Sequence, residues 1–148
     1  MGLVTMTIAD KDRALLALLS ENARMPVAEL ARKLGLSRTT VQARIERLEA
    51  DGVIAGYGLR LSESYLSGLV RAHVLITIAP KALPGVTAAL AAIKEVTTLH
   101  SVSGTFDLIA ILAAPSILDL DRLIDRIGAL DGVERTLSSI ILSTRISR

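Results

Sequence analysis

Residues 32–47 carry five basic side chains and one acid. The basic residues are Arg32, Lys33, Arg38, Arg44 and Arg47. A local excess of cations is typical of a surface that binds the phosphate backbone of a nucleic acid. The alternative is an ordinary solvated helix face, which is the more frequent explanation of a charge cluster taken alone. The residues between the cations decide between the two.

These intervening residues predict a helix with two different faces. Ser37 is a good N-cap for a helix that runs to about Ala50. Val41, Ile45 and Leu48 recur at the spacing of one helix face and are expected to pack inward. The opposite face has small residues at its centre and arginines at its edges. Small side chains allow close approach to the floor of a DNA groove, and arginines at the edges reach phosphates.

The residues before and after this helix predict a helix-turn-helix. Leucines at helical spacing indicate a first helix over 10–19, and a second is expected over 27–34. Gly35 ends the second helix and supplies the positive φ of a tight turn. Residues 53–59 suggest a short hairpin or strand, which would make the domain a winged helix-turn-helix.

The predicted DNA-contacting residues all lie on or just before the third helix. They are Ser37, Arg38, Thr39, Thr40, Ala43, Arg44 and Arg47. For Arg44, a salt bridge within the fold is an equally good interpretation, since the helical wheel places it near the edge of the core. For Arg47, contact with a phosphate is the favoured interpretation.

Beyond residue 69 the hydrophobic pattern predicts a second domain. Residues 60–69 are polar and rich in serine, and they read as a linker or a short connecting strand. Strands are expected over 70–78, 96–103, 108–112 and 134–142, and helices over 84–93 and 119–127. The order βαββαβ is that of a ferredoxin-like unit. The predicted fold class is therefore α+β, with a winged helix-turn-helix domain at 1–59, a linker at 60–69 and a ferredoxin-like domain at 70–148.

Composition excludes several classes of function. The chain has no cysteine, and His73 and His100 are too isolated to suggest a metal site. We find no paired carboxylates and no Ser/His/Asp set, so an enzyme is not expected. No apolar run approaches the length of a membrane span, and no export signal is recognisable, so we expect a cytoplasmic protein. The mean hydropathy of +0.50 is high for a chain of 148 residues, and subunit interfaces explain it best.

Three stretches of sequence resemble the Lrp/AsnC family of transcription regulators, also called feast/famine regulatory proteins. They are "ELARKLGLSRTTVQARIERLEADGVIAGY", "VSGTFDLIAIL" and "LDGVERTLSSIIL". The resemblance extends from about Ile8 to the C-terminus. It implies an N-terminal domain that binds operator DNA. It also implies a C-terminal domain that forms dimers, assembles them into tetramers, octamers or larger rings, and binds an amino-acid effector.

The resemblance also implies an effector site in the second domain, made of Ser103, Gly104, Thr105, Phe106, Asp107, Thr136 and Ser138. A glycine in the loop lets backbone N–H groups face a carboxylate, and Asp107 could hold an ammonium group. Without the resemblance, the loop reads as a hairpin turn in which Asp107 caps backbone groups. Thr136 and Ser138 then read as an ordinary strand edge.

Two hypotheses remain. The first is a sequence-specific DNA-binding regulator, modulated by an amino acid bound at a subunit interface of the C-terminal domain. Its partners would be double-stranded DNA, further copies of the same chain and a small amino acid, with no cofactor and no membrane. The second is a small-molecule-binding assembly protein with weak or no specific DNA binding, which the modest net charge of +2 favours.

Overall fold

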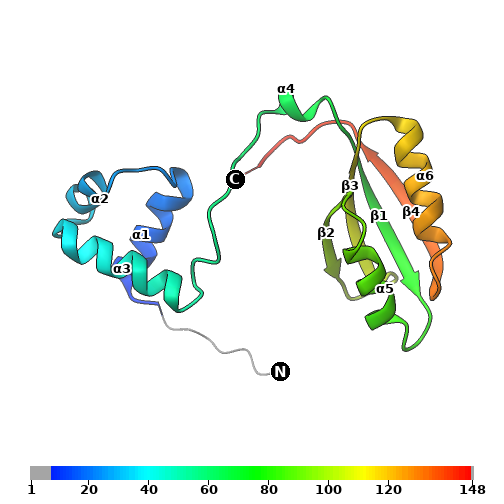
Figure 1. The fold of residues 1–148 in the computed structure, drawn as a ribbon, viewed down its shortest axis with the longest axis horizontal. Coiled ribbons are helices and arrows are strands. Elements are labelled where there is room, and N and C mark those ends of the chain that lie inside the picture. Colours follow the sequence, from blue (N-terminus) through cyan, green and yellow to red (C-terminus); the bar gives the residue numbers. More distant parts are fainter. Residues whose placement is uncertain (1–7, 148) are drawn as a thin grey trace. The chain divides into compact units, whose positions relative to one another are not determined.

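The computed structural model describes residues 8–147 and divides at the Arg60–Leu61 junction into two compact units. Within residues 8–60 the regular elements of the N-terminal unit are all helices, and the C-terminal unit contains a sheet with two helices on it (Figure 1). Each unit has its own hydrophobic core. Each is described below by itself.

Three helices form the N-terminal unit: α1 (Asp10–Glu21), α2 (Val27–Leu34) and α3 (Arg38–Ala50). Their bounds agree with the sequence-based prediction to within two residues. All three contribute to one core, whose buried members are Leu15, Leu19, Leu30, Ala31, Leu34, Val41 and Leu48. Ile45 packs against this core from the same face of α3. The predicted inward stripe of α3 is confirmed.

The turn between α2 and α3 has the expected backbone. Gly35 adopts a left-handed conformation with φ of 64°, and its N–H donates to the Ala31 carbonyl. Leu36 N–H donates to the same carbonyl at 3.0 Å. This is the glycine C-cap that the sequence predicts, and it sets the direction in which α3 leaves the turn.

One local expectation is wrong, and one pair of alternatives is narrowed. Residues 53–59 form no strand or hairpin, so the described part of the N-terminal unit has no β wing. A strand there would need a partner to complete its hydrogen bonds, and none of the described strands lies in this unit. For residues 60–69, the connecting strand is absent and the linker interpretation stays a prediction; the segment contains the short helix α4 (Glu63–Leu66), capped by Ser62.

The C-terminal unit has the predicted βαββαβ order. Its elements are β1 (Val70–Ile78), α5 (Leu83–Ala91), β2 (Val96–Ser101), β3 (Leu108–Ala114), α6 (Ile117–Gly128) and β4 (Val133–Ile141). The sheet is antiparallel throughout, in the order β2-β3-β1-β4. Strands β1 and β3 are the two inner strands, and burial along β1 alternates between buried and half-buried residues. The ferredoxin-like prediction is confirmed.

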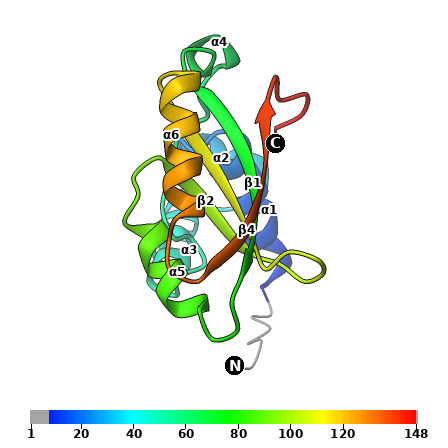
Figure 2. The ribbon, with the colours of Figure 1, turned by 90° about the vertical axis from the view of Figure 1, so that its right-hand side faces the viewer.

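Helices α5 and α6 lie on the same face of the sheet (Figure 2). Ala72, Val74 and Ile76 of β1 are fully buried beneath them. The residues between these three point to the other face, where Leu75 pairs with Ile109 on one side and Leu137 on the other. The sheet therefore has one covered face and one open face with an apolar row across it.

Gly132 in the turn before β4 lies too close to α5 to carry a side chain. Its φ is 91°, and an added Cβ would lie 2.6 Å from Ala82 Cβ and 3.1 Å from Val86 Cγ2. Gly104 also has a positive φ, of 115°, but nothing lies within 4 Å of the place of its Cβ. Substituting alanine at each glycine therefore distinguishes the cost of backbone strain, present at both positions, from the cost of steric overlap, present only at Gly132.

We expect Gly132→Ala to lower the unfolding free energy of the C-terminal unit by about 2–4 kcal/mol, since strain and overlap both act there. Gly104→Ala should cost about 1–2 kcal/mol, from strain alone. Urea titration followed by circular dichroism would measure both. Equal losses in the two variants would contradict the steric contact.

Candidate DNA-binding surface and effector loop

The exposed face of α3 carries the predicted small and basic residues. Arg38, Thr39, Thr40 and Ala43 are all exposed, whereas Val41 between them is fully buried. The N-terminal half of the helix is therefore exposed to solvent on one face, and Val41 packs into the core on the opposite face.

Ser37 caps α3 as predicted. Its Oγ accepts the backbone N–H of Thr40 at 3.1 Å and lies 2.7 Å from the Thr40 hydroxyl. The cap satisfies one of the free N–H groups at the start of the helix. It also fixes the Thr40 hydroxyl, so Thr39 keeps more rotational freedom than Thr40.

A carboxylate from α1 holds the two arginines of the second half of α3. Asp12 Oδ1 accepts from Arg44 Nη1 at 2.7 Å, and Asp12 Oδ2 accepts from Arg47 Nη2 at 2.6 Å. The Asp12 side chain is 6% exposed, that of Arg44 25% and that of Arg47 55%. The internal salt bridge that was the alternative for Arg44 is thus present, and Arg47 shares it.

The residue before Asp12 ties α1 to the other helix of the motif. Lys11 Nζ donates to the Leu34 carbonyl at 2.8 Å. Carbonyl groups at the C-terminus of a helix lack partners within the helix and carry partial negative charge, so a lysine is favourable there. Lys11 and Asp12 therefore bind α2 and α3 from one turn of α1.

The chain beyond α3 folds back along the helices. Ile54 N–H donates to the Leu48 carbonyl at 3.0 Å, and the Tyr57 hydroxyl donates to Glu49 at 2.7 Å. The acceptor carboxylate raises the pKa of the Tyr57 phenol above its ordinary value of 10.0, and partial burial and the charge of Glu49 act in the same direction. These contacts hold the segment where a wing was expected.

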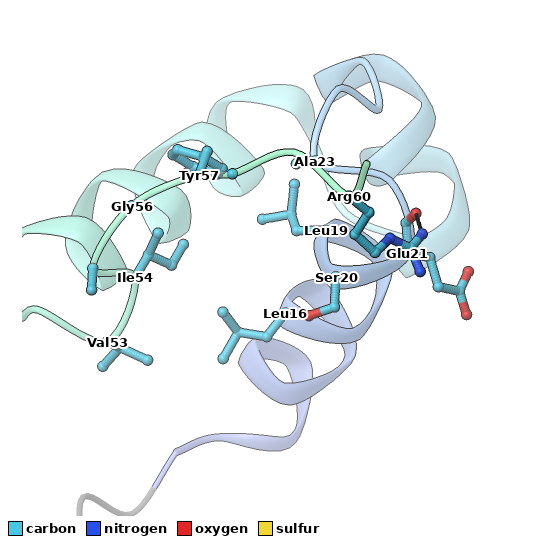
Figure 3. Close-up of a pocket in the computed structure, with 12 residues that line it drawn as sticks. Leu16, Leu19, Ser20, Glu21, Ala23, Val53, Ile54, Gly56, Tyr57 and Arg60 are labelled. Carbon is cyan, nitrogen blue, oxygen red and sulfur yellow. Dashed lines mark hydrogen bonds between the residues drawn. The ribbon is translucent and has the colours of Figure 1, made fainter. Parts of the chain in front are cut away.

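A groove of about 380 Å³ lies between α1 and this segment. Figure 3 shows Leu16 and Leu19 of α1 facing it, with Ile54 across from them and Arg60 beside Glu21. Arg60 Nη2 donates to the Glu21 carbonyl at 3.4 Å. None of these residues belongs to the predicted site.

The predicted effector loop joins β2 to β3. Ser103, Gly104 and Thr105 are exposed, and Phe106 and Asp107 are half-buried. Asp107 Oδ2 accepts the N–H of Ile78 at 2.9 Å, and its own N–H donates to the Ile76 carbonyl at 2.9 Å. Asp107 thus caps the end of β1, which is the role that the turn interpretation gave it.

The two predicted residues of β4 lie apart from the aromatic of this loop. Thr136 pairs with Ile76 and Ser138 with Val74, so both point to the face that α5 and α6 cover. Their neighbour Arg135 points to the open face, and its Cζ lies 5.2 Å from the centre of the Phe106 ring. The structure brings the loop together with Arg135 and does not bring Thr136 or Ser138 to Phe106.

A cavity of about 320 Å³ borders Asp107. Its lining includes Ser101, Val102 and the turn after β1, with Lys81. Lys81 is the one residue other than glycine with a positive φ, 67°, among residues 8–147. Asp107 and Lys81, two residues of opposite charge, therefore both line this cavity.

Comparison with known proteins agrees with both units. The model of the AsnC-type helix-turn-helix domain matches residues 9–49, and that of the Lrp/AsnC ligand binding domain matches residues 71–148. The HTH-type transcriptional regulator LrpA of Mycobacterium tuberculosis is 37% identical over 136 residues, which cover 91% of this chain and 90% of that protein. The chain belongs to the Lrp/AsnC family.

Solved structures agree with this assignment. Escherichia coli AsnC superposes with a TM-score of 0.85 at 30% identity, covering 96% of this chain and 97% of that one. A feast or famine regulatory protein of M. tuberculosis, solved in complex with L-methionine, gives 0.82 at 34% identity, covering 95% and 96%. This Lrp/AsnC protein thus has the family's transcription-regulator architecture, and its relatives are regulators rather than enzymes.

Two residues of this Lrp/AsnC protein lie at the candidate sites but escape prediction from the sequence. Asp12 contacts arginines 32 and 35 positions away, which no local pattern reveals. Lys81 follows a proline in a turn, and Pro80-Lys81 was the only signal available for it.

Between residues 8 and 147, no helix is both long and apolar enough to cross a membrane.

Tyr57 offers a test of how the segment after α3 is held. Because its folded pKa lies above the unfolded value, the Glu49 contact stabilises the fold fully below the unfolded pKa and is lost as the pH rises through the folded one. Glu49→Gln keeps a hydrogen-bond acceptor and removes the charge. We expect tyrosinate absorbance to develop at lower pH in this variant, and Glu46→Gln, whose carboxylate contacts Gln42, to leave the titration unchanged. A titration that Glu49→Gln does not alter would contradict the contact.

Proposed function

We propose that this protein is a sequence-specific DNA-binding regulator in which α3 enters the major groove and the C-terminal unit assembles copies and senses an amino acid. The observation that carries the first part is the exposed face of α3, with Thr39 and Ala43 at its centre and Arg38 beside them. Short side chains let the helix axis approach base edges, and the hydroxyl of Thr39 can donate to or accept from a base. Arg47 and Ser37 are the residues proposed to contact phosphates.

The division of labour between the two arginines follows from their exposure. Arg47 has 55% of its side chain exposed and can reach a phosphate while it contacts Asp12, whereas Arg44 has 25% exposed. We therefore assign phosphate contact to Arg47 and treat Arg44 chiefly as a support of the fold.

Assembly would present two copies of α3 to DNA at once. The open face of the sheet supports assembly, because Leu75, Ile109 and Leu137 form an apolar row there and Leu137 is 55% exposed. A two-fold dimer places equivalent helices in successive major grooves, so operators should be roughly palindromic, with half-sites one or more helical turns apart. Tetramers or octamers would extend the same arrangement.

The effector class proposed is a free amino acid at the Asp107 loop. Asp107 and Lys81 on the cavity wall supply a countercharge for an ammonium group and for a carboxylate. The L-methionine complex of the related M. tuberculosis protein supports this class of ligand. Residues of a neighbouring subunit would complete the site, because the cavity is open on one side and Thr136 and Ser138 point elsewhere in the same subunit.

Selection of duplexes from a random pool by the full-length protein tests DNA recognition. Enrichment of one palindromic sequence, with affinity that falls steeply as salt rises, is the expected result. The modest net charge of +2 leaves a second candidate, an assembly protein with weak or no specific DNA binding. Absence of any enriched sequence at low salt would favour that candidate.

Arg47→Ala should weaken binding to the enriched duplex and to a scrambled duplex by a similar factor, since a phosphate contact carries no sequence information. The slope of log affinity against log salt should fall in magnitude by about 1. Fluorescence anisotropy over a salt series measures both. Arg24→Ala, an exposed arginine in the turn before α2, serves as the control and should keep the slope, and an unchanged slope in Arg47→Ala would remove that residue from the phosphate contacts.

Asp107→Asn should abolish the response to amino acids without unfolding the protein. The asparagine keeps an oxygen for the Ile78 N–H and loses the charge that would pair with an ammonium group. Light scattering and operator binding with each amino acid would show one or a few effectors for the unmodified protein, and at least about tenfold weaker response in the variant. Asp131→Asn, in an exposed turn, is the matched control. No change in assembly or DNA affinity with any amino acid would refute sensing.

A further inference from the structure

We propose that Asp12 is a positioning residue for DNA binding: its buried carboxylate fixes the orientation in which Arg47 meets a phosphate, and it uses Arg44 as the anchor. This inference rests on the proposed DNA-binding function and adds to it a residue outside the recognition helix. Asp12 lies on α1, and no part of the sequence pattern that indicated DNA binding includes it.

The geometry makes Asp12 a bridge between two arginines. One carboxylate oxygen takes Arg44 and the other takes Arg47, at 2.7 and 2.6 Å. With both oxygens engaged, the carboxyl plane is fixed by two contacts on one rigid helix. Asp12 is 4% exposed and is the one buried polar or charged residue identified among residues 8–147. A carboxylate so far out of water persists because both oxygens have charged donors.

Arg47 keeps most of its hydrogen-bonding capacity for a second partner. A guanidinium has five N–H donors in a fixed plane, and the contact with Asp12 uses one nitrogen, Nη2. The side chain is 55% exposed, so the remaining donors can face solvent. Fixing one edge of the plane fixes where the other edge points. Arg44, at 25% exposed and with a buried Nε, has little capacity left for an outside ligand.

The charge balance leaves the cluster attractive to DNA. One carboxylate between two guanidinium groups leaves a net charge of one positive unit, and this excess lies nearer the exposed side, with Arg47. A simple pair of Asp12 with Arg47 would be neutral and would attract a phosphate less. Arg44 therefore compensates the negative charge of Asp12 from the buried side. Asp12 can then hold Arg47 while the positive charge of Arg47 stays available to a phosphate.

A fixed phosphate contact affects specificity although it reads no base. Contacts to the backbone set the register and angle at which a recognition helix enters the groove. A free arginine would reach a phosphate in several conformations and would lose that freedom on binding, which costs affinity. An arginine already held by Asp12 favours one docking angle, the one in which Thr39 and Ala43 face the bases. Asp12 should therefore raise the ratio of specific to non-specific affinity.

Asp12→Asn distinguishes the positioning of Arg47 from electrostatic attraction of DNA to the cluster. The amide has nearly the same shape, but one oxygen becomes an NH₂ group that cannot accept from an arginine, and the cluster gains a unit of positive charge. Affinity for a scrambled duplex should stay the same or rise, while affinity for the enriched duplex falls. The ratio of the two affinities should drop by about tenfold or more. A residue that only stabilised the fold would leave this ratio unchanged in the folded molecules.

The experiment measures both affinities by anisotropy, with the full chain, below the onset of thermal unfolding of each variant. Asp10→Asn is the matched control, since it removes the same charge from an exposed position in the same first turn of α1, and its ratio should equal that of the unmodified protein. Arg47→Lys covers the case in which Asp12→Asn does not fold. It keeps the charge on an exposed position but cannot hold a carboxylate and a phosphate in one plane, so non-specific affinity should persist and the ratio should again drop.

The outcomes are distinct. A preserved ratio in Asp12→Asn, or in Arg47→Lys if Asp12→Asn does not fold, would overturn the positioning role. An equal drop in Asp10→Asn would overturn it as well, because the effect would then be one of net charge. If the unmodified protein enriches no duplex at all, the proposed function itself fails, whatever the variants do.

Discussion

The buried carboxylate of Asp12 is the interaction on which the rest of the N-terminal unit depends. Removing an anion from water costs several kcal/mol even after relaxation, and a single partner seldom compensates for it. Asp12 has two arginines, both at hydrogen-bonding distance and both on α3. The charges therefore specify which face of α3 meets α1, whereas apolar contacts alone would permit sliding. Lys11, the residue before Asp12, contacts α2 through a hydrogen bond to the Leu34 carbonyl.

This arrangement explains why α3 is not a simple amphipathic helix. Its buried stripe is narrow, with Val41 and Leu48 as its fully buried members and Ile45 at the edge. Two of its arginines contact Asp12 of α1, although Arg47 keeps 55% of its side chain exposed. The face left over has the short side chains of Thr39 and Ala43 beside Arg38. The sequence of α3 thus divides the tasks along its length: Asp12 contacts the C-terminal half, and the N-terminal half carries the residues proposed to face bases.

Patterns within single elements predicted most of the fold. Gly35 and Ser37 fixed the turn and the start of α3, and alternation along β1 identified the buried face of the sheet, because these signals depend on local backbone conformation. The predictions fail where the structure of a segment depends on a contact with residues that are distant in the sequence. Residues 53–59 have strand-like side chains, but the described part of their unit holds no strand to pair with, and the hydrogen bond of Tyr57 to Glu49 holds them instead. Asp12 and Arg47 are 35 residues apart, and no spacing rule joins them.

The candidate effector site shows the same limit in the other unit. Gly104 and Asp107 were identifiable as a turn, and the turn is present. The partner of Phe106 was not, because it depends on strand register: Arg135 and Thr136 are adjacent in sequence but lie on opposite faces of β4. A site that needs the loop together with Thr136 and Ser138 cannot be assembled from one subunit by side-chain motion alone, since the strand lies between them. If both sets contact an effector, they do so from different copies of the chain, and effector binding is then coupled to assembly by geometry.

The N-terminal unit need not change shape in such a mechanism. Asp12 holds α3 within the unit, so in the proposed mechanism an effector that changed how copies associate would change the spacing between two copies of α3, and with it their fit to a palindromic operator.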